Sequence, residues 1–224
     1  MPTLDSRQAP GHRVGVPAPA DQHLLDLALE AFAERGYDGT SVRDVCRRAG
    51  VSHNLVHERY GSKEAFWYAS VDHGFRSLAE DLAQAAAGAG PDDFAQLRAI
   101  LLRYVETTAE QPSLIRLINT EAAHPGPRLD HIYQRYIEPA HALADAFLRR
   151  LERAGRIRRV PAATLHFLIG HGAGGIVSLP GLAGKWQGRR SEPPLLDQAR
   201  SAVELILDAM SLEEPVTAPV RRRA

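Results

Sequence analysis

The 224-residue sequence has a single cysteine, no excess of charge of either sign and no long uninterrupted apolar run. With Cys46 alone, no internal disulfide can form, which fits a reducing compartment. Lys and Arg together number 27, as do Asp and Glu. No overall field therefore draws the chain toward nucleic acid or a membrane, and any such function must rest on local charge.

Membrane and export signals are also missing. The longest uncharged stretch, 164–184, contains a proline and six glycines, which leaves too little hydrocarbon for a membrane helix. Residues 1–20 hold four prolines and two arginines and lack the apolar centre of a signal peptide. We expect a cytoplasmic protein that does not enter a membrane, with a flexible arm at 1–20 and a flexible tail at 213–224.

What the chain does contain is apolar residues at helical spacing. They recur every three or four positions in the segments 25–32, 94–104, 133–151 and 196–210. Glycine and proline separate these segments, and Pro139 inside one of them predicts a kink. The pattern predicts an all-α fold of about nine helices, and the length suits one or two domains.

Three short helices are expected near the amino end, at 21–35, from Ser41 to Ala49, and from His53 to Tyr60. Ser41 begins a capping-box pattern, and Ser52 can cap the third helix after a tight turn at Gly50. This order predicts a helix-turn-helix, although a three-helix piece of an ordinary bundle would show the same periodicity.

Local charge favours the helix-turn-helix. Residues 40–63 carry five cations and two carboxylates, a net charge of +3, while the first helix is acidic. Clustered cations neutralise phosphates, and short polar side chains early in the third helix can contact base edges. The segment is therefore a candidate for binding double-stranded DNA.

The same segment resembles the tetracycline-repressor (TetR) family of transcriptional regulators. The matching motifs run from Leu24 to Phe66 and include Gly-Tyr at 36–37, Thr-Ser-Val-Arg-Asp-Val at 40–45, Ala-Gly-Val-Ser at 49–52, and Tyr-Gly-Ser-Lys-Glu-Ala-Phe at 60–66. Asn54 stands where a small residue is common in the family, and His57 stands where tyrosine is common.

The resemblance implies a DNA-binding domain at 21–66, a ligand-binding and dimerisation domain at 67–212, and a homodimer. It implies that the major groove is contacted by Ser52, His53, Asn54 and His57. It implies that phosphates are contacted by Thr40, Ser41, Arg43, Tyr60 and Lys63. For single residues a structural role stays open, with Tyr60 in the core or Arg47 and Arg48 on a solvated face.

Two motifs of other chemistries fail in their context. His53 and His57 have the spacing of two zinc ligands on one helical face, but Asn54 stands where a metalloprotease has its glutamate. Residues 170–175 match the Gly-x-Gly-x-x-Gly pattern of dinucleotide-binding proteins, but Pro180 follows closely and no strands alternate with helices. We expect no metal and no cofactor.

Those glycines suit close contact between helices instead. Each glycine costs a helix about 1 kcal/mol, so a run of them needs a packing reason. In the resembled family the last two helices form the dimer. The resemblance therefore places the interface residues in these helices: Gly170, Gly174, Ile176, Val203, Ile206 and Met210.

The region between Ala95 and Ile176 is expected to bind a small-molecule effector that releases DNA, as in a repressor. Its polar candidates are Arg116, Asn119, Tyr133 and His171, set among apolar residues that favour a lipophilic or aromatic ligand. No spacing among its polar residues defines a reaction, so no catalytic residue is predicted. An all-helical enzyme or a helical scaffold remains the alternative.

Overall fold

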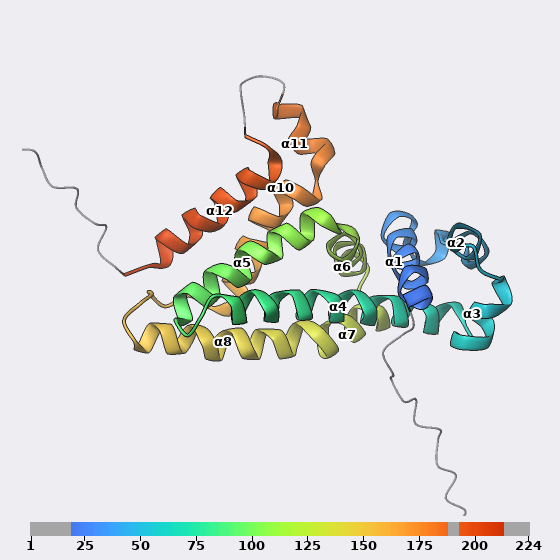
Figure 1. Cartoon of the computed structure of the whole chain (residues 1–224), viewed down its shortest axis with the longest axis horizontal. Coiled ribbons are helices and arrows are strands. Elements are labelled where there is room, and N and C mark those ends of the chain that lie inside the picture. The colour runs from blue at the N-terminus through green and yellow to red at the C-terminus, as the bar shows by residue number, and fades with distance from the viewer. Residues whose placement is uncertain (1–18, 188–192, 213–224) are drawn as a thin grey trace, which may run out of the picture.

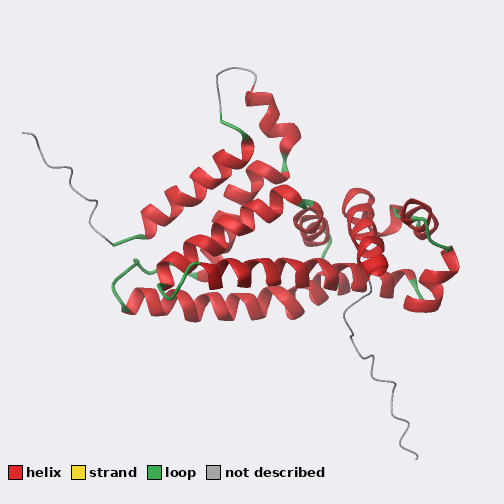
Figure 2. Ribbon diagram, in the orientation of Figure 1, coloured by secondary structure: helices red, strands yellow, loops and turns green. Residues whose placement is uncertain are grey.

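The computed structural model describes residues 19–187 and 193–212 (Figure 1). Within that part the chain is helical, apart from loops and one isolated bridge between Ile157 and Ser211, and it contains no strand (Figure 2). The predicted all-α fold is confirmed. The tail at 213–224 and all but the last two residues of the arm at 1–20 lie outside the described residues.

The helices follow one another closely along the chain. In order they are α1 (Pro19–Gly39), α2 (Val42–Ala49), α3 (His53–Tyr60), α4 (Lys63–Gly88), α5 (Asp93–Glu110), α6 (Ser113–Ala123), α7 (Pro127–Ile132), the π-helical η1 (Tyr133–Ile137), α8 (Glu138–Arg153), α9 (Ala162–Phe167), the π-helical η2 (Leu168–Ala173), α10 (Gly174–Ser178), α11 (Pro180–Gln187) and α12 (Leu195–Met210). Because α7, η1 and α8 are continuous, as are α9, η2 and α10, these elements form ten continuous helices within the described residues.

The helix that the sequence pattern did not predict is α11. Prolines at 180, 193 and 194 predict a break there, and the structure instead begins a helix at Pro180. Proline is tolerated in the first turn of a helix, where its missing amide would have no partner.

Pro139 lies within the continuous α7–η1–α8 helix, as the second residue of α8, which directly follows η1. The wider π-turn accommodates the lost amide and the ring, so a π-helical turn stands where a kink is expected.

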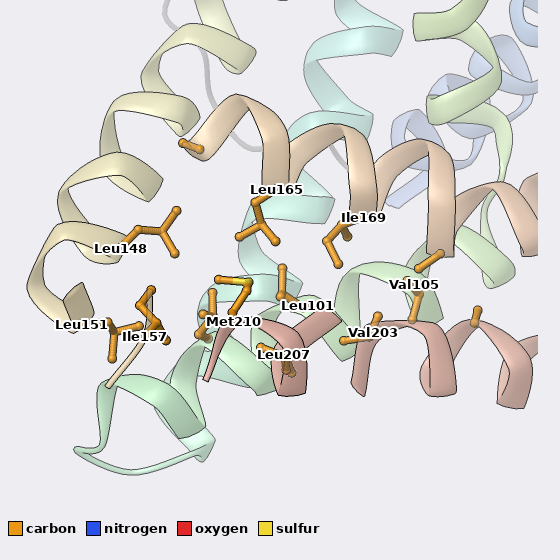
Figure 3. Packing of buried hydrophobic residues seen from close by; sticks show 14 of the residues in the cluster. Leu101, Val105, Leu148, Leu151, Ile157, Leu165, Ile169, Val203, Leu207 and Met210 are labelled. Atoms are coloured by element: carbon orange, nitrogen blue, oxygen red, sulfur yellow. The ribbon is translucent and has the colours of Figure 1, made fainter. Parts of the chain in front are cut away.

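The core forms two clusters joined by α4. The first lies among α1, α2, α3 and the beginning of α4, and also takes in Leu117 of α6 and Ile132 of α7. The second lies among α5, α8, the α9–η2–α10 helix and α12 (Figure 3). Helix α4 runs from α3 along α5 (Figure 1). The expected domain boundary at 66/67 falls inside this helix, which continues without a break across it.

No helix among the described residues combines the length and apolarity required to cross a lipid bilayer.

Candidate nucleic-acid interface

Helices α2 and α3 meet at a tight, doubly capped turn. The Ser41 hydroxyl accepts a hydrogen bond of 3.3 Å from the amide of Asp44, and Gly50 ends α2 with a φ of 68°. The Ser52 hydroxyl then accepts a 3.3 Å bond from the amide of Asn54 at the start of α3. Both predicted caps are confirmed, and the two helices form a helix-turn-helix.

Helix α3 has an inner and an outer face. Val56 is buried among the residues of the first cluster, and α3 packs against α2 and α4. On the other face His53, Asn54 and His57 are exposed, as is Ser52 before them. These side chains supply hydrogen-bond donors and acceptors at the open surface of the turn.

The cations of this segment are not equally free. Arg47 pairs with Asp44 at 2.9 Å, Arg48 pairs with Glu30, and Arg59 pairs with Asp21. Arg43 and Lys63 have no carboxylate partner within the described residues. The sequence count of +3 therefore overstates the free positive charge, although exposed ion pairs are weak and exchange readily for a phosphate.

Thr40 and Tyr60 lie differently from the sequence prediction. Thr40 is 3% exposed, and its hydroxyl lies 2.7 Å from the Gly36 carbonyl and 3.0 Å from that of Ala31. This placement corrects the phosphate contact expected of the Thr40 side chain, because the hydroxyl is already used inside the protein. Tyr60 is half-buried, its ring lies 5.0 Å from that of Phe66, and burial raises its pKa. It contributes to the core, as the alternative reading allowed.

Lys63 lies at the first turn of α4. The helix is capped by Ser62, whose hydroxyl accepts a 3.0 Å bond from the amide of Ala65. The Lys63 ammonium lies 4.8 Å from the ring centroid of Tyr37 and donates a 3.4 Å bond to the Asp38 carbonyl. It is held by neutral groups, and a phosphate can compete with them.

The four polar residues expected to hold a ligand are not gathered in one place. Asn119 and His171 are exposed, Tyr133 is 47% exposed, and Arg116 is half-buried. They lie on α6, η1 and η2. A cavity of about 280 Å³ lies elsewhere, between the second half of α8 and residues 159–161, and charged side chains line much of it.

Most of the residues expected at the dimer interface are buried within one chain. Gly170, Gly174, Val203 and Met210 belong to the interior, and Figure 3 shows Val203 and Met210 directed into the second cluster. A Cβ at Gly170 or Gly174 would approach Tyr104 of α5, at 3.5 Å and 3.6 Å respectively. The glycines therefore serve contact with α5 of the same chain, which corrects their expected place between two copies. Ile176 and Ile206 are half-buried.

Among the described residues, no group of three or more His, Cys, Asp or Glu side chains is placed to hold a metal ion.

The chain has relatives of known family. Residues 24–67 match the family model for bacterial regulatory proteins of the tetR family. An HTH-type transcriptional repressor of Mycobacterium tuberculosis is 31% identical over 162 residues, which cover 67% of this chain and 80% of that protein. The chain belongs to the TetR family. It is a DNA-binding transcriptional regulator, and its relatives are regulators and not enzymes.

Solved structures share the fold of this TetR-family chain. The ketosteroid transcriptional regulator KstR2 of Mycobacterium tuberculosis has a TM-score of 0.61 at 18% identity, covering 90% of this chain and 100% of its own. The fatty acid degradation regulator FadR from Bacillus halodurans has a TM-score of 0.65 at 15% identity, covering 93% and 100%. At such identities the likeness concerns the fold alone.

Sequence reasoning missed a junction between the TetR-family DNA-binding unit and the helices behind it. Arg128 of α7 donates through Nε to both carboxylate oxygens of Glu121, each at 3.0 Å, and its guanidinium lies 4.4 Å from the ring centroid of Tyr37. His131 lies 2.8 Å from Asp72 nearby. Tyr37 falls inside a family motif, but no pattern of spacing connects it with residues more than eighty positions away.

Proposed function

We propose that the chain is a repressor that binds a near-palindromic operator as a two-fold dimer and releases it when a lipophilic or aromatic small molecule binds. In this proposal residues 21–66 contact DNA, and residues 67–212 hold the effector and the second copy. The observation that carries the DNA contact is the exposed row of His53, Asn54 and His57 on a doubly capped α3. A helix of this size fits the major groove.

Each exposed side chain suits one part of the duplex. Asn54 can bond two edge atoms of adenine, and His53 and His57 can donate to or accept from base edges, with Ser52 beside them. Ser41, Arg43 and Lys63 are assigned in this proposal to the backbone phosphates that flank α3 in the groove. Arg43 and Lys63 are the cations of this segment that have no carboxylate partner within the described ranges 19–187 and 193–212.

The dimer is proposed to use the same helices that the family resemblance indicated, but through other residues. Phe167 is 61% exposed and Leu205 is 70% exposed, and Leu168 and Leu179 are also open to solvent. They belong to the α9–η2–α10 helix, the residue that follows it, and the adjacent α12. Large exposed apolar side chains on neighbouring helices are typical of a contact surface, and a two-fold dimer would cover the same patch on both copies.

The effector is proposed to bind among the helices between Ala95 and Ile176. The second cluster is rich in aliphatic side chains, and two proteins that share the fold are a ketosteroid transcriptional regulator and a fatty acid degradation regulator. Both observations favour a lipophilic ligand. Arg116 is the one polar candidate with a half-buried side chain, so we propose it as an anchor; Asn119, Tyr133 and His171 would have to turn inward to join it.

Two measurements test the proposal. Selection from random duplexes with the purified full chain should enrich a near-palindromic sequence, which then binds by fluorescence anisotropy with one dimer per duplex. Recovery of no preferred sequence would contradict operator binding. A thermal-shift screen of lipophilic and aromatic compounds should yield stabilising ligands that weaken this binding; if every stabilising compound left DNA affinity unchanged, the ligand switch would fail while the DNA contact stood.

A further inference from the structure

An ion pair with a buried carboxylate joins α6 to α7 behind the DNA-binding unit. The Nε of Arg128 lies 3.0 Å from each carboxylate oxygen of Glu121, whose side chain is 6% exposed. A buried carboxylate without a partner is strongly unfavourable. Glu121 therefore holds the Arg128 guanidinium in one place.

Held this way, the guanidinium lies on aromatic rings of α1 and α4. Its central carbon is 4.4 Å from the ring centroid of Tyr37 and 5.9 Å from that of Trp67. A planar guanidinium at this distance is attracted to the ring, more strongly where water is excluded. Tyr37 also stacks on Phe32 of the first cluster, with ring centroids 6.1 Å apart. The Tyr37 ring is thus fixed by its own core and by Arg128.

The same ring carries a second cation. The Lys63 ammonium is 4.8 Å from the Tyr37 centroid and reaches the Asp38 carbonyl at 3.4 Å. Two like charges near one ring repel each other, and they share its attraction. Because Arg128 and the first cluster fix the Tyr37 ring, the ring in turn fixes where the Lys63 ammonium lies. Because two cations share its attraction, the ammonium can still bind an anion at the surface.

We propose that Arg128 is a positioning residue for operator binding, which acts through Tyr37 to present the Lys63 ammonium to a DNA phosphate without touching DNA itself. The inference rests on the phosphate contact that we propose for Lys63. Because Arg128 and Glu121 belong to α7 and α6, a displacement of these helices alters the phosphate contact. This gives an effector bound behind α6 a route to lower operator affinity.

The test uses a charge-matched double substitution, Glu121→Gln with Arg128→Gln. It removes the guanidinium, leaves the net charge unchanged and orphans no buried charge, since two amides can still form a hydrogen bond. We expect binding about three- to tenfold weaker, equally for a selected operator and a random duplex, with a salt slope smaller by about one. Lys63→Ala should give the same result. Adding Lys63→Ala to the double variant should then cause no further loss.

A second pair of variants tests the ring itself and does not disturb the ion pair. Tyr37→Phe keeps the ring and should bind DNA as the unchanged protein does, whereas Tyr37→Leu should reproduce the loss. Unfolding midpoints are measured for every variant, because a purely structural role would lower the midpoint without changing the salt slope.

Three outcomes overturn the inference. Additive losses from Lys63→Ala and the double variant would show that Arg128 does not act through Lys63. Equal DNA binding by Tyr37→Leu and Tyr37→Phe would show that the Tyr37 ring does not position Lys63. If Lys63→Ala alone left affinity and slope unchanged, the proposed phosphate contact would be wrong and the inference would fall with it, while selection of a preferred duplex would still support operator binding.

Discussion

Gly174 and Tyr104 lie so close that a Cβ on Gly174 would be 3.6 Å from a ring carbon of Tyr104 and 3.1 Å from the carbonyl oxygen of Ile169. The contact joins α10 to α5 inside one chain, and a Cβ would be in ordinary van der Waals contact with Tyr104 but tight against the Ile169 carbonyl. Gly170 and Gly174 therefore pack against α5 of the same chain, and the dimer that we propose uses the exposed apolar residues of these helices instead.

Substitutions at Gly174 and Leu205 should separate folding from dimerisation. Gly174→Arg places a charge in the second cluster and should lower the free energy of unfolding by about 3–5 kcal/mol, the usual effect of an unpaired buried charge. Leu205→Arg lies on the exposed face of α12 and should leave the fold intact but give a monomer. Urea unfolding and sedimentation equilibrium distinguish the two. A Leu205→Arg protein that remains dimeric would move the interface elsewhere.

Substitutions on α3 should change which bases are preferred more than how tightly DNA is held. Asn54→Ala or His57→Ala removes an exposed polar group from the outer face of the helix. Each should relax base preference at one position by about 1–3 kcal/mol, with an unchanged salt slope. Repeating the selection from random duplexes with each variant measures this. An unaltered preference with His57→Ala would remove His57 from the proposed groove contacts.

Thr40 should contribute to the stability of the fold and not to DNA binding. Thr40→Val keeps the shape of the side chain but removes the hydroxyl that bonds to the α1 backbone, and should lower the free energy of unfolding by about 1–3 kcal/mol. Thr40→Ser retains the hydroxyl and serves as the matched variant. The salt dependence of DNA binding should be the same for all three proteins, since the side chain faces inward. If the salt dependence of DNA binding had a smaller slope for Thr40→Val, the phosphate contact predicted for Thr40 from the sequence would be supported.

His166 should make the protein less stable in mild acid. Burial lowers the pKa of His166 below its ordinary 6.5, and the nearby His141 and His171 lower it further. As the pH falls through 6.5, the unfolded chain takes up a proton that the folded chain resists, so stability decreases. His166→Gln should therefore lose less stability than the unchanged protein between pH 7.5 and 5.5, measured by urea unfolding. The same change at exposed His23 is the control, and an identical loss in both variants would contradict the prediction.

The local features of the DNA-binding unit were readable from the sequence. Ser41 and Ser52 cap their helices as predicted, because a cap depends on groups two or three residues away. The polar side of α3 follows from the positions of His53, Asn54 and His57 relative to buried Val56. Local spacing fixes both features before any tertiary contact forms.

The sequence by itself determined the helices other than α11, the turn between α2 and α3, and the resemblance to the family. Only the tertiary structure decided which distant groups certain side chains contact. Thr40 turns inward, Gly174 packs on Tyr104, and Arg128 reaches Tyr37 across ninety-one positions of chain. Helical periodicity shows which residues share a face of a helix. Packing among segments distant in sequence decides which other helix contacts that face. Contacts of that kind exist only in the folded chain.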